Sequence, residues 1–200
     1  TLELLTAGRS LADSLKQELT VVMIGDDLDR TTRTLVDYGP DNVILVSGED
    51  MRYFIPETYA EALRGLAAQR RPAIILFPAT YDGRDLASRL AAKLGVGLAA
   101  DCTDLRIDET GRFIQIRPAF GGNIMATIVT ERTRPQMATV RPHVMPMPEK
   151  DASRKGEIVR ESVPIKEDDI AVKVLQVIED ARQGAECIDL TAAEVIVSGG

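Results

Sequence analysis

The sequence predicts an α/β fold: a doubly wound, mostly parallel sheet of the nucleotide-binding-like kind, with an added β-hairpin region. The first observation behind this prediction is a unit of strand, loop and helix that repeats through the first half of the chain. Its apolar runs are continuous, which is typical of strands buried on both faces of a parallel sheet. The second observation is a set of alternating apolar runs around glycine-containing turns, which indicates antiparallel hairpins. The three continuous runs lie at 19–24, 42–46 and 73–77.

Four helices are predicted between and before these strands, from apolar residues that recur at helical spacing. They cover 1–15 and 28–38, a segment that begins at Pro56, and a segment that carries Leu86, Leu90 and Leu94 and ends at Gly95. Ligands of doubly wound sheets lie beyond the carboxyl ends of the strands. The loops after Gly25, Ser47 and Pro78 are therefore the places to expect one.

None of these loops contains a dinucleotide-binding glycine fingerprint or a phosphate-binding lysine motif. The loop at 79–85 could hold an anion on helix amides and Arg84. Alternatively, Thr80 or Asp82 simply caps the helix that follows.

The hairpin region begins with runs at 105–107 and 113–116, which flank a polar turn that ends at Gly111. A second hairpin pairs 114–117 with 124–129 around the turn 120–123. Gly121 and Gly122 in that turn either let backbone or ligand approach closely or make a flexible turn. Arginine is enriched here, and lysine is absent, between Gly111 and His143. That usage favours planar, stacking or bidentate contacts. The arginines are Arg112, Arg117, Arg132, Arg134 and Arg141.

Composition excludes several function classes. A formal net charge of −7 argues against nucleic-acid binding, which needs a basic surface. No apolar run is long enough to cross a bilayer, and the first residues do not resemble a signal sequence, so a cytoplasmic protein is expected. Cys102 and Cys187 lack metal-site spacing and are expected to be reduced and packed. With His143 interpreted as structural, no catalytic or metal-binding residues are predicted, and chemistry would come from a bound cofactor.

The last quarter of the chain changes in character. Prolines and mixed charges at 146–169 indicate an extended connector on the surface that follows a domain at 1–145. The β-branched run at 170–178 and the run at 194–197 are each predicted to form a strand, within a closing segment at 170–200.

The motif RPAFGGNIMATIV followed by TRPQMATVRP resembles the N-terminal domain of the α-subunit of electron transfer flavoproteins, which carries this hairpin and the strand after it. Upstream FPATYDGRDLASRLAAKLGVGLAADCTDL and terminal VIVSGG agree in order and spacing, so the resemblance covers nearly the whole chain. In this family a strand precedes the first helix, and an FAD-binding domain follows the terminal glycines. We therefore expect that first strand, and most of the FAD-binding domain, to be missing from these 200 residues.

The resemblance implies an electron carrier rather than a stand-alone enzyme. Members of the family are αβ heterodimers in which the C-terminal α domain holds FAD and the β-subunit holds AMP or a second FAD. The first α domain, which binds no nucleotide of its own, forms with the β-subunit a base for the mobile flavin domain. The expected partners are thus a β-subunit and an acyl-CoA dehydrogenase-type protein. The GGN and TRPQM segments are most similar to the α-subunits of anaerobic bacteria, which often bifurcate electrons. This similarity implies NADH as electron donor, and ferredoxin and an enoyl-CoA as acceptors.

Site residues follow from motif placement within that resemblance. Phe120, Gly121, Gly122 and Asn123 would line the approach of flavin or nicotinamide, with Arg134 and Gln136 beside them; packing at a subunit interface is an equal alternative. Ser198, Gly199 and Gly200 would belong to a loop that touches the flavin. A different class of function, a stand-alone adenine-nucleotide-binding module of the universal-stress-protein type, would use the loops after Gly25 and Pro78. A small NAD-dependent dehydrogenase is disfavoured by the missing glycine fingerprint.

Overall fold

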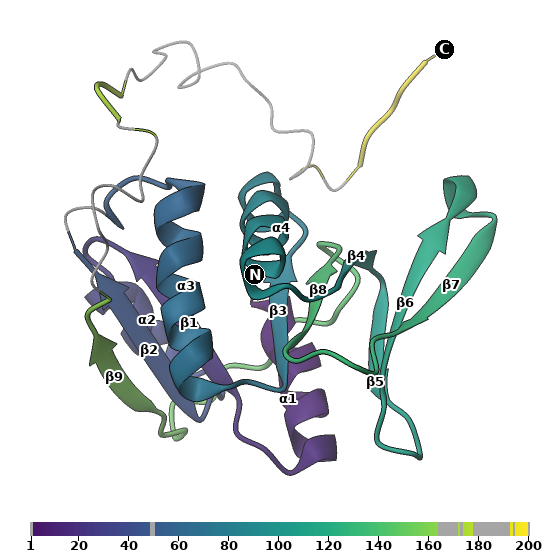
Figure 1. The fold of residues 1–200 in the computed structure, drawn as a ribbon, viewed down its shortest axis with the longest axis horizontal. Coiled ribbons are helices and arrows are strands. Elements are labelled where there is room, and N and C mark those ends of the chain that lie inside the picture. Colours follow the sequence, from purple (N-terminus) through teal and green to yellow (C-terminus); the bar gives the residue numbers. More distant parts are fainter. Residues whose placement is uncertain are drawn as a thin grey trace.

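The computed structural model describes residues 2–48, 51–163, 172, 174–177, 193 and 195–199. It confirms the predicted α/β class, with parallel strands between helices and an antiparallel hairpin region beside them (Figure 1). The helices are α1 (Glu3–Leu15), α2 (Asp29–Val36), α3 (Pro56–Arg70) and α4 (Tyr81–Leu94). The strands are β1 (Thr20–Gly25), β2 (Asn42–Ser47), β3 (Ile74–Pro78), β4 (Leu98–Cys102), β5 (Asp104–Ile107), β6 (Phe113–Ala119), β7 (Ile124–Val129), β8 (Gln136–Val140) and β9 (Glu157–Glu161).

The first parallel sheet has the order β1-β2-β9. Its central strand β2 is buried from Val43 to Val46, as its continuous apolar sequence predicts. The outer strand β9 lies within the segment predicted as a connector, and no pairing had been predicted there. Gly156 lets the backbone before β9 lie close to the backbone at Pro40, since an added Cβ would lie 2.8 Å from the carbonyl oxygen of Pro40. Pattern analysis missed β9 because its partner is more than a hundred residues away in sequence.

The second parallel sheet has the order β3-β8-β4. Strand β8, which the family resemblance implied, is buried along its whole length between the other two strands. Strand β4 was not predicted, because its sequence LAADC is short and ends in a polar residue. The carboxyl ends of all three strands meet, with the N–H of Arg141 donating to the carbonyl oxygen of Cys102 at 2.9 Å.

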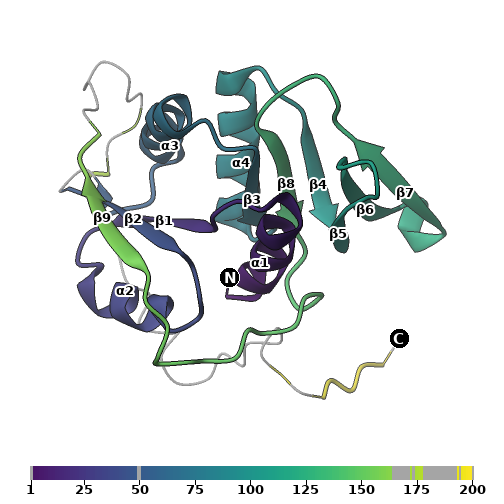
Figure 2. The ribbon, with the colours of Figure 1, turned by 90° about the horizontal axis from the view of Figure 1, so that it is seen from below.

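Helices cover both faces of the two parallel sheets. Figure 2 shows α3 and α4 on one side and α1 and α2 on the other. Ile44 and Val46 of β2 pack with Leu66 of α3, whereas Leu11 of α1 packs in a cluster with Phe113 and other residues of the hairpin region. This three-layer core is the rigid support from which the hairpins project.

The free edges of β1 and β3 face each other between the two sheets (Figures 1 and 2). Within the described residues, β1 pairs only with β2, and β3 pairs only with β8. Helix α1 begins beside the carboxyl end of β8, where the N–H of His143 donates to Glu3 Oε2 at 2.7 Å. Its other end leads into the start of β1. A strand placed between β1 and β3 and leading into α1 would run parallel to both of these strands.

The third sheet is the antiparallel ladder β5-β6-β7, and both predicted hairpins are confirmed. Gly111 has the positive φ of +80° that the first turn was expected to require. Of the two strands predicted near the C-terminus, the described residues 172, 174–177 and 195–197 lie in no regular element. The other residues of the two predicted strands lie outside the described ranges, so these strands stay predictions.

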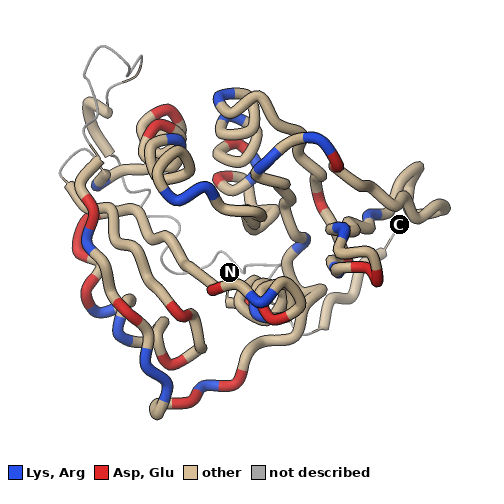
Figure 3. The backbone as a smooth tube through the Cα atoms, turned by 60° about the horizontal axis from the view of Figure 1, so that its bottom comes forward, with Lys and Arg blue, Asp and Glu red and all other residues tan. Residues whose placement is uncertain are grey.

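None of the helices in the described ranges is both long enough and apolar enough to span a membrane. Figure 3 shows that Lys and Arg are interspersed with Asp and Glu along the described chain instead of collecting on one side. The described surface therefore lacks the broad basic face on which nucleic-acid binding depends.

Candidate functional site

The tip of the β6–β7 hairpin presents apolar side chains to solvent. Phe120 is 82% exposed, and Ile124 and Met125 are 54% and 56% exposed. Figure 1 shows that this hairpin projects away from the helices and the parallel sheets. A projecting apolar tip of this kind marks a surface that another molecule covers.

The turn at this tip forces three consecutive residues into the left-handed region. Phe120, Gly121 and Gly122 have φ values of +50°, +69° and +92°. Glycine adopts such angles freely, but an exposed phenylalanine does so at a cost. A Cβ added to either glycine would meet nothing within 4 Å, so their conformation, not contact with the rest of the chain, requires glycine here. The exposed Phe120 therefore lies in a turn with a strained backbone.

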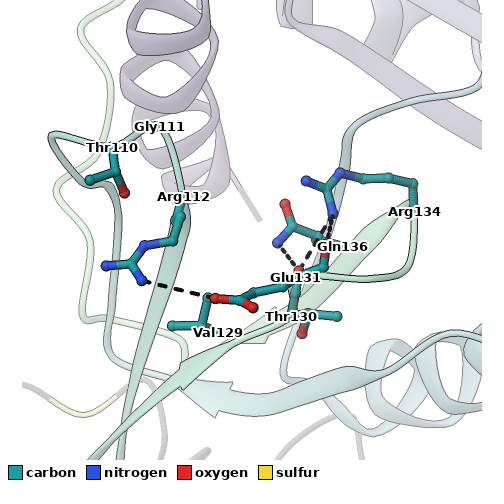
Figure 4. Close-up of a pocket in the computed structure, with 8 residues that line it drawn as sticks. All are labelled: Thr110, Gly111, Arg112, Val129, Thr130, Glu131, Arg134 and Gln136. Carbon is teal, nitrogen blue, oxygen red and sulfur yellow. Dashed lines mark hydrogen bonds and ion pairs between the residues drawn. The ribbon is translucent and has the colours of Figure 1, made fainter.

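Arg134 and Gln136 lie at the amino end of β8. Arg134 Nη1 donates to the carbonyl oxygen of Thr133 at 2.9 Å, and Gln136 Nε2 donates to that of Thr130 at 2.5 Å. Figure 4 shows both side chains turned toward the loop that follows β7. They help line a solvent-open hollow of about 350 Å³ with Arg112 and the first hairpin turn. Both side chains thus shape the loop at 130–133.

The prediction that Arg134 and Gln136 lie beside the turn 120–123 is wrong. Strand β7 separates the two groups, and its six residues span roughly 20 Å at the usual rise of a strand. Ile124 pairs with Ala119 at the tip, whereas Val129 pairs with Ile114 near the body of the domain. The structure therefore offers an exposed tip and a separate polar hollow, not one combined site.

The predicted site residues at the C-terminus form no defined arrangement in the described part of the chain. Ser198 and Gly199 are exposed and lie in no regular element, and Gly200 lies outside the described residues. Whether any of the predicted residues contacts a cofactor stays a prediction.

Several arginines of the hairpin region serve the chain itself. The guanidinium of Arg112 donates from Nε to Asp108 Oδ2 at 2.8 Å, across the first turn. Hydrogen bonds from Thr110 and then Arg112 hold the pKa of Asp108 well below its ordinary value. Arg134 is held by backbone carbonyls as described above, and Arg141 by a carboxylate. These three arginines therefore all have hydrogen-bond partners within the chain.

The carboxyl edge of the β3-β8-β4 sheet gathers further charged groups. Arg141 Nη2 donates to Asp101 Oδ2 at 2.6 Å, and Arg84 Nη2 donates to Asp101 Oδ1 at 3.4 Å. Asp101 has a φ of +62°, and its N–H donates to the Oγ1 of buried Thr139 at 2.8 Å. The hydrogen bond from Arg141, aided by the charges of Arg84 and Arg117, lowers the pKa of Asp101 despite partial burial. Sequence patterns did not single out Asp101; its only signal was a polar residue at the end of a short apolar run.

The loop after β3 is explained by helix capping. Thr80 Oγ1 accepts a hydrogen bond from the N–H of Gly83 at 3.2 Å, which confirms the capping interpretation. The guanidinium of Arg84 reaches Asp101 at the carboxyl edge of the β3-β8-β4 sheet.

The remaining candidate side chains have local explanations. Cys102 is free and buried, as predicted, and burial raises the pKa of its thiol to about 11. Cys187 lies outside the described residues. The ring of His143 is exposed, with Nδ1 3.6 Å from Glu3 Oε1. Within the part of the chain that the structure describes, no cluster of three or more His, Cys, Asp or Glu side chains could hold a metal ion.

A flavin can be contacted but not enclosed by the predicted residues. The Phe120 ring and the side-chain-free backbone of Gly121 and Gly122 offer a flat contact for a planar ring system. All of these groups are exposed, so a cofactor would need a second surface to hold it. The arrangement suits a surface that receives a group carried by another domain or subunit.

Comparison with known proteins shows the family of the chain. Residues 1–166 match the model of the electron transfer flavoprotein domain. The chain is 42% identical over 199 residues to an electron transfer flavoprotein subunit alpha of Thermoanaerobacterium thermosaccharolyticum, covering all of this chain and 59% of that protein. It is 42% identical over 201 residues to Protein FixB of Azorhizobium caulinodans, and the match covers 99% of this chain and 54% of that protein. It is 34% identical over 223 residues to acryloyl-CoA reductase electron transfer subunit beta of Anaerotignum propionicum, and the match covers 99% of this chain and 60% of that protein. The chain thus spans little more than half the length of these relatives.

Proposed function

Because the chain belongs to the electron transfer flavoprotein domain family, we propose that it is the base domain of an α-type subunit of such a protein. In this role it holds a β-type subunit and a mobile flavin domain in position. The observation that carries the proposal is a rigid three-layer core with one projecting apolar hairpin tip, in a chain of this family. The base includes β9, which pairs with β2, so it extends at least to Glu161, and 170–200 would lead into the flavin domain.

The apolar tip is the proposed contact with the β-type subunit. Exposed Phe120, Ile124 and Met125 would be buried by association, and burial of apolar area is the main favourable term in such interfaces. The strained backbone at Phe120 presents the ring in advance, so little conformational entropy is lost on binding. The hairpin is therefore the element that recognises the partner.

FAD, held chiefly by the flavin domain and by the β-type subunit, supplies the electron transfer. The residues of this chain limit access to it: the turn 120–123 lies against the flavin or nicotinamide, and Ser198 to Gly200 lead toward the flavin domain. Further electron partners are an acyl-CoA dehydrogenase-type protein and, with bifurcation from NADH, ferredoxin and an enoyl-CoA. Support for an acyl-CoA-linked role comes from one relative, which is named as an electron transfer subunit of acryloyl-CoA reductase.

The facing free edges of β1 and β3 accept an additional strand in this proposal. That strand would precede α1 and repeat the strand, helix, strand arrangement already formed by β1, α2 and β2. Pairing on both sides would join the two parallel sheets into one. Comparing urea unfolding of this chain with that of a chain extended at its amino end tests the idea. A higher midpoint supports it, and an unchanged midpoint contradicts it.

Co-expression with an electron transfer flavoprotein β-type subunit tests the proposed function. A tag on the β-type subunit should retain this chain at a 1:1 ratio through size-exclusion chromatography. A folded chain that elutes alone would contradict the proposal. The universal-stress-protein alternative gains no support, because Asp26, Asp27 and Asp29 follow β1 where a nucleoside triphosphate would have to lie.

A further inference from the structure

Three arginines from three different elements converge at the carboxyl edge of the β3-β8-β4 sheet. Arg84 comes from α4, Arg117 from β6, and Arg141 from the residue that follows β8. Arg84 and Arg141 both hydrogen-bond Asp101, and the charge of Arg117 also acts on that carboxylate. One aspartate neutralises only one of three guanidinium groups, so two positive charges remain uncompensated within the cluster. This excess is unusual in a chain with a net charge of −7.

Buried polar atoms of β6 have no hydrogen-bond partner among the described residues. Gln115 is 0% exposed, yet neither its Nε2 nor its Oε1 makes a hydrogen bond. The Nε of Arg117 is also buried and unpaired. These two residues lie two positions apart on β6, so their side chains share one face of the strand. Burying such groups without a hydrogen bond is unfavourable, which indicates that something else satisfies them.

The free groups match a phosphate group better than a water molecule. An ordered water could satisfy Gln115, but it would leave the two positive charges uncompensated. A phosphate carries between one and two negative charges near neutral pH and accepts several hydrogen bonds from guanidinium groups. Side-chain exposures of 56% for Arg84 and 43% for Arg141 leave one side of the cluster open to solvent. An anion could therefore enter past these two arginines and lie near Gln115.

We propose that Arg84, Arg117 and Arg141 bind a phosphate group, free or carried by a small molecule, with Gln115 as a neutral hydrogen-bonding partner. Asp101 holds Arg84 and Arg141 in place between binding events. The site lies at the carboxyl ends of parallel strands, where doubly wound folds bind their ligands. It does not depend on the β-type subunit, so it can be tested on this chain alone.

Titration of inorganic phosphate into the purified chain, at constant ionic strength set with chloride, tests the proposal by thermal unfolding and calorimetry. We expect saturable stabilisation by phosphate. Arg84→Gln should weaken binding at least about tenfold, because it removes a charge-assisted hydrogen bond. The matched control is Arg89→Gln on the same helix, where Arg89 pairs with Glu57 and Asp85. This control should bind phosphate as the parent chain does. Equal weakening by both variants, or no saturable binding, would overturn the proposal.

A second variant separates binding from a purely structural role. Gln115→Met replaces unpaired polar atoms by an apolar group of similar shape, so the ligand-free chain should be as stable as the parent or more so. Phosphate binding should nevertheless weaken at least about threefold, and loss of stability with unchanged binding would contradict the assignment. AMP and adenosine distinguish the source of the phosphate. Binding of AMP but not adenosine supports a phosphate site, and equal binding of adenosine overturns it.

Discussion

Single residues fix the loops of this domain by close backbone contact and by local hydrogen bonds. Gly83 is the clearest case, because an added Cβ would lie 2.0 Å from the carbonyl oxygen of Pro78. The sequence predicted the neighbouring cap at Thr80, since caps are local patterns. It did not predict the close approach at Gly83, which depends on how β3 meets α4. For the same reason, the sequence did not single out Asp101 and Gln115. Their surroundings are formed by segments that are distant in the sequence.

Gly83→Ala should destabilise the chain by up to about 2 kcal/mol. Helix propensity alone favours alanine by about 1 kcal/mol, but overpacking against backbone costs about 1–3 kcal/mol, and little room exists for relaxation. Urea unfolding measures the difference. Gly48→Ala is the control, because a Cβ at that position meets nothing within 4 Å. A stabilised Gly83→Ala variant would show that the α4 entry is looser than described.

The acid sensitivity of the fold should depend on Asp41. Partial burial would raise the pKa of Asp41, but the N–H of Leu19 and the guanidinium of Arg9 outweigh it and hold that pKa below its ordinary value. A lowered pKa in the folded state means that the stabilisation is complete above an unfolded-state pKa of about 4 and is lost as pH falls through the folded-state pKa. Between about pH 5 and 3, the free energy of unfolding should therefore fall more steeply for the parent than for Asp41→Asn. Parallel pH profiles for the two proteins would contradict this role.

At the scale of elements, the buried parallel strands and their helices were predictable, and the edges of the sheets were not. The continuous apolar run of β2 predicts a buried strand, and the cap and terminal Gly95 of α4 predict a helix. In contrast, β9 is a charged edge strand that exists only through pairing with β2.

The hairpin tip should matter for association and not for folding. Phe120→Ala should change the free energy of unfolding by less than about 0.5 kcal/mol, since an exposed ring contributes little to the core. The same change should weaken binding to the β-type subunit by at least about tenfold, as loss of an interface anchor does. Tyr81→Ala removes an equally exposed ring, 94% accessible, from the start of α4 and serves as the control. Equal effects of the two substitutions on binding would remove the special role of the hairpin.

At the scale of the whole molecule, the chain presents two unequal surfaces. One is the apolar tip of the β6–β7 hairpin, and the other is the basic cluster at the carboxyl edge of the second parallel sheet. The family resemblance predicted the first as a motif, but its arginine and glutamine companions lie beyond the other end of β7, a strand whose six residues span roughly 20 Å. Motif order alone does not reveal the length of the hairpin that separates them.

Amide hydrogen exchange of the chain, free and bound to an electron transfer flavoprotein β-type subunit, tests the central claim most directly. The account predicts that complex formation slows exchange at the hairpin tip, residues 119–125, and leaves the charged outer strand β9 unchanged. Protection confined to β9, or no protection at any amide in the presence of saturating β-type subunit, would contradict it.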